Sequence, residues 1–241
     1  MTDALGFYEH LTFNAPLSEA RADALVGRLA AAAPSTVLDV GCGWGELLVR
    51  VGAACPEVSA LGVDTEERHL ERARSRAVEL AVADRVRFEN RPGDQLTEPA
   101  DVVICIGSSH AFGDTAAEAL VGLRKLVRPG GRLVLGEGTW EVRGPVEPEL
   151  VWDDLVALPS VAGLVDVAVE AGLRPLWIET ANEDELFAFE SGYLADLEEW
   201  LVHHDDAAVR SRADEHRRRW LHGYRNAFGF AYLTLGVPAL S

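Results

Sequence analysis

Basic residues, cysteines and long apolar runs are scarce in this chain, and each shortage argues against a class of protein. The 241 residues include 22 Lys and Arg against 39 Asp and Glu, which gives a formal net charge of −17. Because such an acidic surface repels phosphate groups, we expect neither a nucleic acid nor an anionic membrane as a partner. The one basic run, Arg217-Arg218-Arg219, is short.

The few cysteines and the absence of a long apolar run bear on location. Three cysteines without a paired spacing indicate free thiols in a reducing compartment. The longest uncharged stretch, residues 226–241, is shorter than the roughly 20 residues that a membrane span needs. The first residues lack the basic and apolar regions of a signal peptide. We therefore expect a cytoplasmic protein that is not bound to a membrane.

From residue 36 onward, short apolar strands alternate with helical segments. The expected strands are 36–40, 58–63, 86–89, 101–106, 132–136 and 176–179, and the expected helices are 46–54, 66–82, 116–127 and 161–171. Apolar strands that alternate with helices predict a parallel sheet with both faces covered. The fold class is therefore α/β.

We expect one domain, residues 1–241, in four parts. A helix that begins near Ser18 and ends before Pro34 belongs to an N-terminal helical cover over 1–34, and the core follows over 35–181. The alternation stops in a charged, aromatic and helical insertion over 182–225, and 226–241 holds the last strand, 228–237.

The most informative segment is a glycine-rich loop between the first strand and the next helix. The strand that contains Asp39 leads into Gly41, Gly43 and Gly45, and the helix begins at Glu46. Glycines permit a tight turn and let a ligand approach bare main chain, and the start of a helix offers free N–H groups. A carboxylate at the end of the strand can receive an ammonium group.

The spacing of these glycines differs from the dinucleotide fingerprint G-x-G-x-x-G. Its third glycine would fall on Glu46, whose carboxylate would repel a pyrophosphate. The loop therefore favours a ligand that has no phosphates but has a cationic or zwitterionic part.

Two more residues follow strands that end at the same edge of the predicted sheet. Asp64 ends the second strand, where an acidic residue of a doubly wound fold accepts hydrogen bonds from ribose hydroxyls. His110 follows the fourth strand, and open α/β sheets bind ligands outside the carboxyl ends of their strands. The pattern indicates a nucleoside ligand with His110 directed at its site.

These segments resemble successive motifs of the class I S-adenosylmethionine-dependent methyltransferases. The resemblance covers about residues 35–140 and includes the strand 101–107 and the Pro129-Gly130-Gly131 turn. It implies a doubly wound, Rossmann-like sheet of seven mostly parallel strands, with an antiparallel last strand and a helical insertion before it.

The resemblance also implies the cofactor, S-adenosylmethionine, and the residues that hold it. Gly41, Gly43 and Gly45 would approach the methionine part, and Asp64 would hold the ribose. The strand end Ile106–Gly107 would flank the cofactor, and Gly93 and Asp94 are assigned to the adenine. We expect Asp39 to receive the ammonium group.

For the methyl acceptor, His110 is the candidate general base, because histidine is the side chain whose ordinary pKa lies nearest neutrality. Glu137, Trp140 and Tyr8 are candidate substrate contacts, each with structural packing or hydrogen bonding as the alternative. Aromatic residues of the insertion are candidates for a substrate lid. His203 and His204 are adjacent on a helix and point apart, so we expect no metal site.

The sequence thus predicts methyl transfer from S-adenosylmethionine to an oxygen or nitrogen of a small metabolite, with secondary metabolism as one setting. A non-catalytic S-adenosylmethionine-binding module and, disfavoured by Glu46, an NAD-dependent dehydrogenase are the alternatives. The sequence leaves the identity of the acceptor and the oligomeric state open, with a homodimer among the alternatives.

Overall fold

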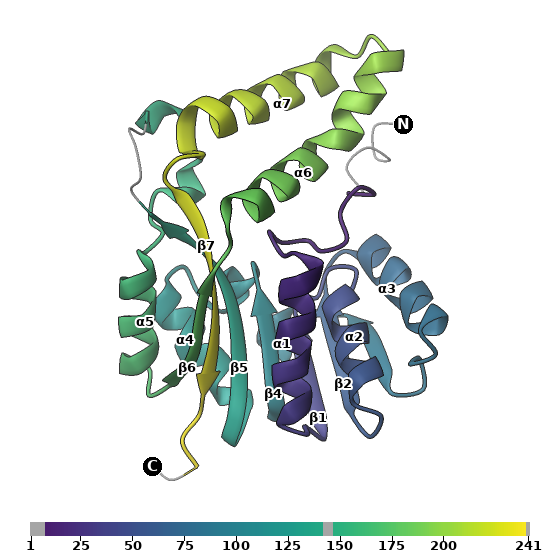
Figure 1. Ribbon diagram of the computed structural model, residues 1–241, viewed down its shortest axis with the longest axis vertical. Helices are drawn as coiled ribbons and strands as arrows, with labels where there is room; N and C mark the ends of the chain where they lie inside the picture. The colour runs from purple at the N-terminus through teal and green to yellow at the C-terminus, as the bar shows by residue number, and fades with distance from the viewer. Residues whose placement is uncertain (1–7, 142–146, 240–241) are drawn as a thin grey trace. The chain divides into compact units, whose positions relative to one another are not determined.

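The computed structural model describes residues 8–141 and 147–239 and divides into two compact units (Figure 1). The sheet unit comprises residues 18–137, 162–180 and 231–241, and the helical unit comprises residues 1–17, 138–161 and 181–230. Each unit is described separately below, for the residues that the structure describes.

The sheet unit is built on a seven-stranded sheet, as counted over the described residues, in the order β3-β2-β1-β4-β5-β7-β6. The strands are β1 Thr36–Val40, β2 Ser59–Asp64, β3 Val86–Asn90, β4 Ala100–Ile106, β5 Val127–Trp140, β6 Arg174–Thr180 and β7 Phe228–Gly236. β1 pairs in parallel with β2 and β4, whereas β6 and β7 are antiparallel. The predicted doubly wound, mostly parallel sheet is confirmed.

The order of the strands locates a ligand-binding edge. From β1 the chain proceeds outward to β2 and β3, and it then returns to place β4 on the other side of β1. In open α/β sheets the crevice at such a reversal, outside the carboxyl ends of the strands, receives the ligand. The ends of β1 and β4 therefore mark the candidate site.

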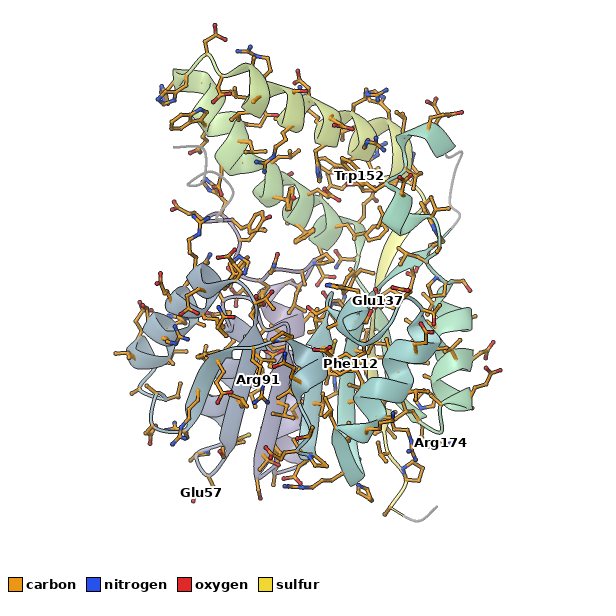
Figure 2. The ribbon with its side chains drawn as sticks, turned by 180° about the vertical axis from the view of Figure 1, so that it is seen from behind. Glu57, Arg91, Phe112, Glu137, Trp152 and Arg174 are labelled. Carbon is orange, nitrogen blue, oxygen red and sulfur yellow. The ribbon has the colours of Figure 1, made fainter. Side chains whose placement is uncertain are left out.

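Helices cover both faces of the sheet. They are α1 Glu19–Ala31, α2 Glu46–Ala54, α3 Glu67–Glu79, α4 Ala116–Lys125 and α5 Val161–Glu170. In Figure 1, α1 and α2 lie in front of the sheet, and Figure 2, seen from behind, shows α4 on the opposite face. Fully buried leucines and valines such as Leu48, Val103 and Leu120 fill the layers between them.

Side chains at the helix starts explain several boundaries. Ser18 accepts a hydrogen bond from the main chain of Arg21, and Thr115 forms a capping box with Glu118 at the start of α4. At the start of α3 the capping residue is Glu66, whose side chain accepts from the main chain of Arg68, and not the preceding Thr65. α3 also ends at Glu79, before the predicted residue 82.

The fifth strand is longer than its apolar residues predict. β5 already begins at Val127 and includes Pro129, Gly130 and Gly131, where the sequence predicts a turn before the strand 132–136. Its pairing with β4 is irregular between Ala100 and Val102, and Gly130 has a φ of +83°. A left-handed glycine within an irregular strand end has no apolar signature, so the pattern missed this part of β5.

The helical unit contains α6 Glu183–His203, α7 Ala207–Arg218 and the π-helix Arg219–Tyr224. Asn182 and Glu185 form a capping box at the start of α6. Apolar side chains hold these helices together, namely Leu194, Leu197, Val209, Ala213, Trp220 and Tyr224. The predicted helical character of residues 182–225 is confirmed.

The remaining short helices are 3-10 turns. They are η2 Gly93–Gln95, η3 Ser109–Phe112, η4 Pro148–Leu150 and η5 Asp153–Leu155. Within the described part of the chain, no helix combines the length and the hydropathy that a membrane crossing requires.

Candidate functional site

The glycine-rich loop between β1 and α2 is held in conformations that favour glycine. Gly41, Gly43 and Gly45 have φ angles of +65°, +53° and +68°. A Cβ added to Gly41 would lie 2.0 Å from the Oγ of Ser108, the second residue after β4. The loop therefore lies against the end of β4 with its main chain bare, and a bulkier residue at Gly41 would collide with Ser108.

Asp64, at the end of β2, fixes this loop. Its Oδ2 accepts a hydrogen bond from the Gly43 N–H at 2.8 Å, and its Oδ1 accepts one from the Glu66 N–H at 2.9 Å. A carboxylate has about four acceptor positions, so Asp64 retains capacity for further donors. The residue predicted to hold a ribose diol thus also sets the conformation of the glycine loop.

Asp39 lies in β1 immediately before the loop and is 5% exposed. Burial, and to a smaller extent the charge of Asp64, raises the pKa of Asp39 from 3.8 to about 7. A buried carboxyl with a second carboxylate nearby gains stability from a cationic ligand. This electrostatic setting suits the ammonium group of an amino acid.

Glu46 takes a different role from the one that the glycine spacing suggests. Its carboxylate accepts hydrogen bonds from Arg50 Nε and Arg76 Nε, both at 2.8 Å. Because two guanidinium groups neutralise this buried carboxylate, the predicted repulsion between Glu46 and a pyrophosphate is not supported. Glu46 therefore does not exclude a dinucleotide as the ligand of the loop.

The loop after β3 returns to the end of β1. A Cβ on the buried Gly93 would lie 2.4 Å from Val40 Cγ1 and 3.6 Å from a ring carbon of Phe112. Asp94 is the next residue and is exposed. The structure thus brings Gly93 to the β1 edge, beside Phe112 of η3, which is labelled in Figure 2. The adenine contact assigned to Gly93 and Asp94 stays a prediction.

The end of β4 completes the group in the sheet unit. Ile106 and the exposed Gly107, with a φ of +68°, end the strand, and Ser108 Oγ donates to the Gly41 carbonyl at 3.3 Å. Ser109 is hydrogen-bonded to Glu137, which Figure 2 labels. His110 is exposed in η3 and makes no hydrogen bond or ion pair with the described residues.

Buried Cys105 in β4 does not supply a nucleophile. Burial, together with the nearby charges of Glu137 and Asp39, raises the pKa of its thiol. A thiol held neutral is a weak nucleophile, so Cys105 does not offer a thiolate to a ligand.

Two predicted acceptor contacts belong to the helical unit. Trp140 Nε1 donates to the Leu155 carbonyl at 2.7 Å, and the ring of Tyr8 stacks on Tyr193 with centroids 5.0 Å apart. Both side chains therefore have structural partners inside their own unit. Their contact with an acceptor stays a prediction.

The pair of Glu190 and His216 in the helical unit was not predicted from the sequence. Glu190 Oε2 lies 2.7 Å from His216 Nε2, although the two residues are 26 positions apart. Helical periodicity within a segment gives no information about such a pairing between two helices. Across the described residues, no cluster of three or more histidine, cysteine or acidic side chains is arranged to hold a metal ion.

Comparison with known proteins points to one family. A family model described as "Methyltransferase domain" matches residues 38–133, which include the glycine loop, Asp64 and His110. The chain is 28% identical over 242 residues to the uncharacterized protein YjhP of Escherichia coli, and the match covers 94% of each chain. It is 37% identical over 145 residues to the 27-O-demethylrifamycin SV methyltransferase of Amycolatopsis mediterranei, covering 59% of this chain and 46% of that one.

Two solved structures of similar fold, one of them with a bound ligand, cover nearly the whole chain. A methyltransferase from Geobacter sulfurreducens, solved in complex with S-adenosyl-L-homocysteine, has a TM-score of 0.83 at 23% identity, with 95% of each chain covered. The structure of YjhP has a TM-score of 0.84 at 24% identity and covers 96% of this chain and 97% of that one. At these identities the structures show that the fold is shared.

Proposed function

Because this chain belongs to the class I S-adenosylmethionine-dependent methyltransferases, we propose that it methylates an oxygen or nitrogen of a small metabolite. The single observation that carries the proposal is the hydrogen bond from Gly43 N–H to Asp64, which joins the bare glycine loop to the acid of β2. These groups suit the two polar ends of a nucleoside attached to an amino acid.

The sheet unit offers a complementary group to each part of S-adenosylmethionine. The glycine loop of Gly41, Gly43 and Gly45, which has no side chains beyond Cα at these positions, takes the methionine part, and Asp39 balances the ammonium group. Asp64 accepts hydrogen bonds from the ribose hydroxyls. Gly93 and Asp94 take the adenine, and Ile106 and Gly107 flank the molecule.

When bound, S-adenosylmethionine supplies a methyl group on a positively charged sulfur. The chain therefore has to position the acceptor and exclude water, with little acid catalysis needed for the leaving group. His110, exposed and without a described partner, accepts the proton that an oxygen or nitrogen acceptor loses. Glu137, Trp140 and Tyr8 contact the acceptor in this proposal.

Two named relatives support a small acceptor. One is the rifamycin enzyme above, and the other is a trans-aconitate 2-methyltransferase from Methylobacterium radiotolerans, 27% identical over 225 residues. The net charge of −17 also opposes a nucleic acid acceptor. The proposal places the enzyme in the cytoplasm, which cell fractionation tests. It also places the reaction in secondary metabolism, which identification of the methylated product tests.

Calorimetric titration with S-adenosylhomocysteine tests the proposal. Wild type should bind at micromolar strength, and Asp64→Ala should weaken binding by about tenfold to a hundredfold, because it removes hydrogen bonds to a charged acceptor. Asp84→Ala is the matched control, since Asp84 is exposed and, among the described residues, is paired with its neighbour Arg85 at 2.8 Å. Equal affinity of Asp64→Ala and wild type would refute the ribose assignment.

A metabolite screen tests the transfer itself. Incubation of the protein with S-adenosylmethionine and pooled small molecules should yield a product heavier by one methylene unit, detected by mass spectrometry. S-adenosylmethionine binding without any such product across oxygen and nitrogen acceptors would contradict the proposed acceptor class.

A further inference from the structure

The helical unit holds a buried polar cluster that the proposed chemistry of the sheet unit does not use. Its members are Glu190 on α6, His216 on α7 and Tyr224 in the π-helix. The side chain of Glu190 is 9% exposed and that of His216 is 17% exposed. Taking such groups out of water is costly unless they are paired, so their arrangement calls for an explanation.

Hydrogen bonding in the cluster leaves one nitrogen of His216 available. Glu190 Oε2 accepts from His216 Nε2 at 2.7 Å, and Glu190 Oε1 accepts from the Tyr224 hydroxyl at 2.9 Å. Because a carboxylate oxygen only accepts, the hydrogen of this pair is assigned to Nε2, and in that tautomer Nδ1 carries a lone pair. Among the described residues, none forms a hydrogen bond with Nδ1.

Aromatic rings surround this imidazole. The Tyr193 ring is stacked on it at 4.7 Å with an angle of 22° between the planes, and Tyr8 continues the stack on Tyr193. Trp152 lies 6.0 Å from the imidazole, and Figure 2 shows it beside the C-terminal end of α7. Stacked aromatic rings favour flat, unsaturated ligands over flexible aliphatic ones.

The chemistry of the cluster selects the ligand class. Glu190 already accepts from Tyr224 and pairs with His216, and its side chain is only 9% exposed, so its burial keeps the carboxylate from an outside cation. The same negative charge opposes a carboxylic acid. The cluster presents a hydrogen-bond acceptor, Nδ1 of His216, next to aromatic rings. A ligand that matches it carries an uncharged hydrogen-bond donor on an aromatic ring.

We propose that the Glu190–His216–Tyr224 cluster binds the hydroxyl of a phenol-like ring, which donates a hydrogen bond to His216 Nδ1. This ligand site belongs to the helical unit and goes beyond the proposed function, and the ligands that it takes are hydroxylated aromatic molecules. Glu190 acts as a positioning residue because it fixes the tautomer of His216. His216 binds the hydroxyl, and the proton-accepting role proposed for His110 is separate.

Fragment binding in the absence of any methyl donor tests this inference. Phenol, anisole and benzylamine are titrated onto the full chain and followed by ligand-observed nuclear magnetic resonance. Phenol should bind roughly two- to tenfold more tightly than anisole, its methyl ether, which is the effect of one hydrogen bond. Benzylamine should bind no more tightly than anisole. Equal binding of phenol and anisole would overturn the inference.

Variants test whether the tighter binding of phenol than of anisole depends on His216. Glu190→Gln/His216→Phe removes Nδ1 without leaving a lone buried charge and should abolish the preference for phenol. The control His203→Gln, at an exposed histidine of α6, should keep this preference. A preference that survives in the double variant would place the phenol elsewhere and refute the assignment.

A second variant keeps the test decisive if the double variant does not fold. Tyr193→Ala removes the ring stacked on His216 and should weaken phenol and anisole alike, by roughly threefold or more. Unchanged binding of both fragments would contradict the inference. Because no methyl donor is present, these results are independent of S-adenosylhomocysteine binding, so either proposal can fail while the other stands.

Discussion

Replacing Gly41 with alanine tests whether the glycine loop is built by contact with the end of β4. The φ of +65° costs an alanine about 1–2 kcal/mol in the left-handed region. The added Cβ would lie 2.0 Å from Ser108 Oγ and 2.3 Å from Ser108 Cβ. Overpacking of this kind costs about 1–3 kcal/mol. The expected loss in the free energy of unfolding is therefore about 2–5 kcal/mol.

A double-mutant cycle separates the two contributions. Ser108→Gly removes both colliding atoms and leaves the Ser108 Cα at 3.8 Å, an ordinary contact distance. Gly41→Ala should therefore cost about 1–2 kcal/mol in the Ser108→Gly background, where only the backbone strain remains. Urea denaturation of the four proteins measures the cycle, and S-adenosylhomocysteine titration should show parallel losses and recovery. The reasoning fails if Gly41→Ala unfolds at the same urea concentration as wild type, or if Ser108→Gly gives no recovery.

Three further predictions follow from the described contacts. The pKa of Asp39 is about 7 in the folded protein and 3.8 in the unfolded chain. As the pH rises from about 4 to about 7, the unfolded chain loses this proton first, so the free energy of unfolding should fall by up to about 4 kcal/mol. Asp39→Asn should make the free energy of unfolding nearly independent of pH over that range. Wild type should release a proton when S-adenosylmethionine binds at pH 6, measured by calorimetry in two buffers, and Asp39→Asn should not. An unchanged pH dependence and an unchanged proton release would contradict the pKa assignment. His110→Gln should lower turnover of an identified acceptor by roughly a hundredfold or more while S-adenosylhomocysteine affinity stays constant, and a fully active variant would remove His110 as the base. Thr115→Ala should cost about 1 kcal/mol of stability by breaking the capping box of α4, measured by urea denaturation, and no loss would show that Glu118 alone holds that helix end.

Much of the sheet unit was predictable because apolar runs and glycines record local requirements. The run 36–40 is buried on both faces in β1, and Gly41, Gly43 and Gly45 indeed adopt left-handed conformations. Asp64 ends β2 where the spacing placed it. In each case the sequence signal and the structural cause lie within a few residues of each other.

What the sequence could not predict depends on contacts between distant segments. One of the two arginine partners of Glu46 is Arg76, 30 positions away on α3, and it helps to neutralise the carboxylate whose repulsion the glycine spacing suggested. The pair of Glu190 and His216 joins two helices. Periodicity shows which face of a helix is apolar, but it does not show which polar side chain of another helix lies opposite.

The crystal structure of the protein with bound S-adenosylhomocysteine tests the central claim most directly. It should show the two ribose hydroxyls within hydrogen-bond distance of Asp64 and the amino acid part along the main chain of Gly41 to Gly45, with its ammonium group next to Asp39. A nucleoside bound away from Asp64, or a glycine loop without any ligand contact, would contradict the account.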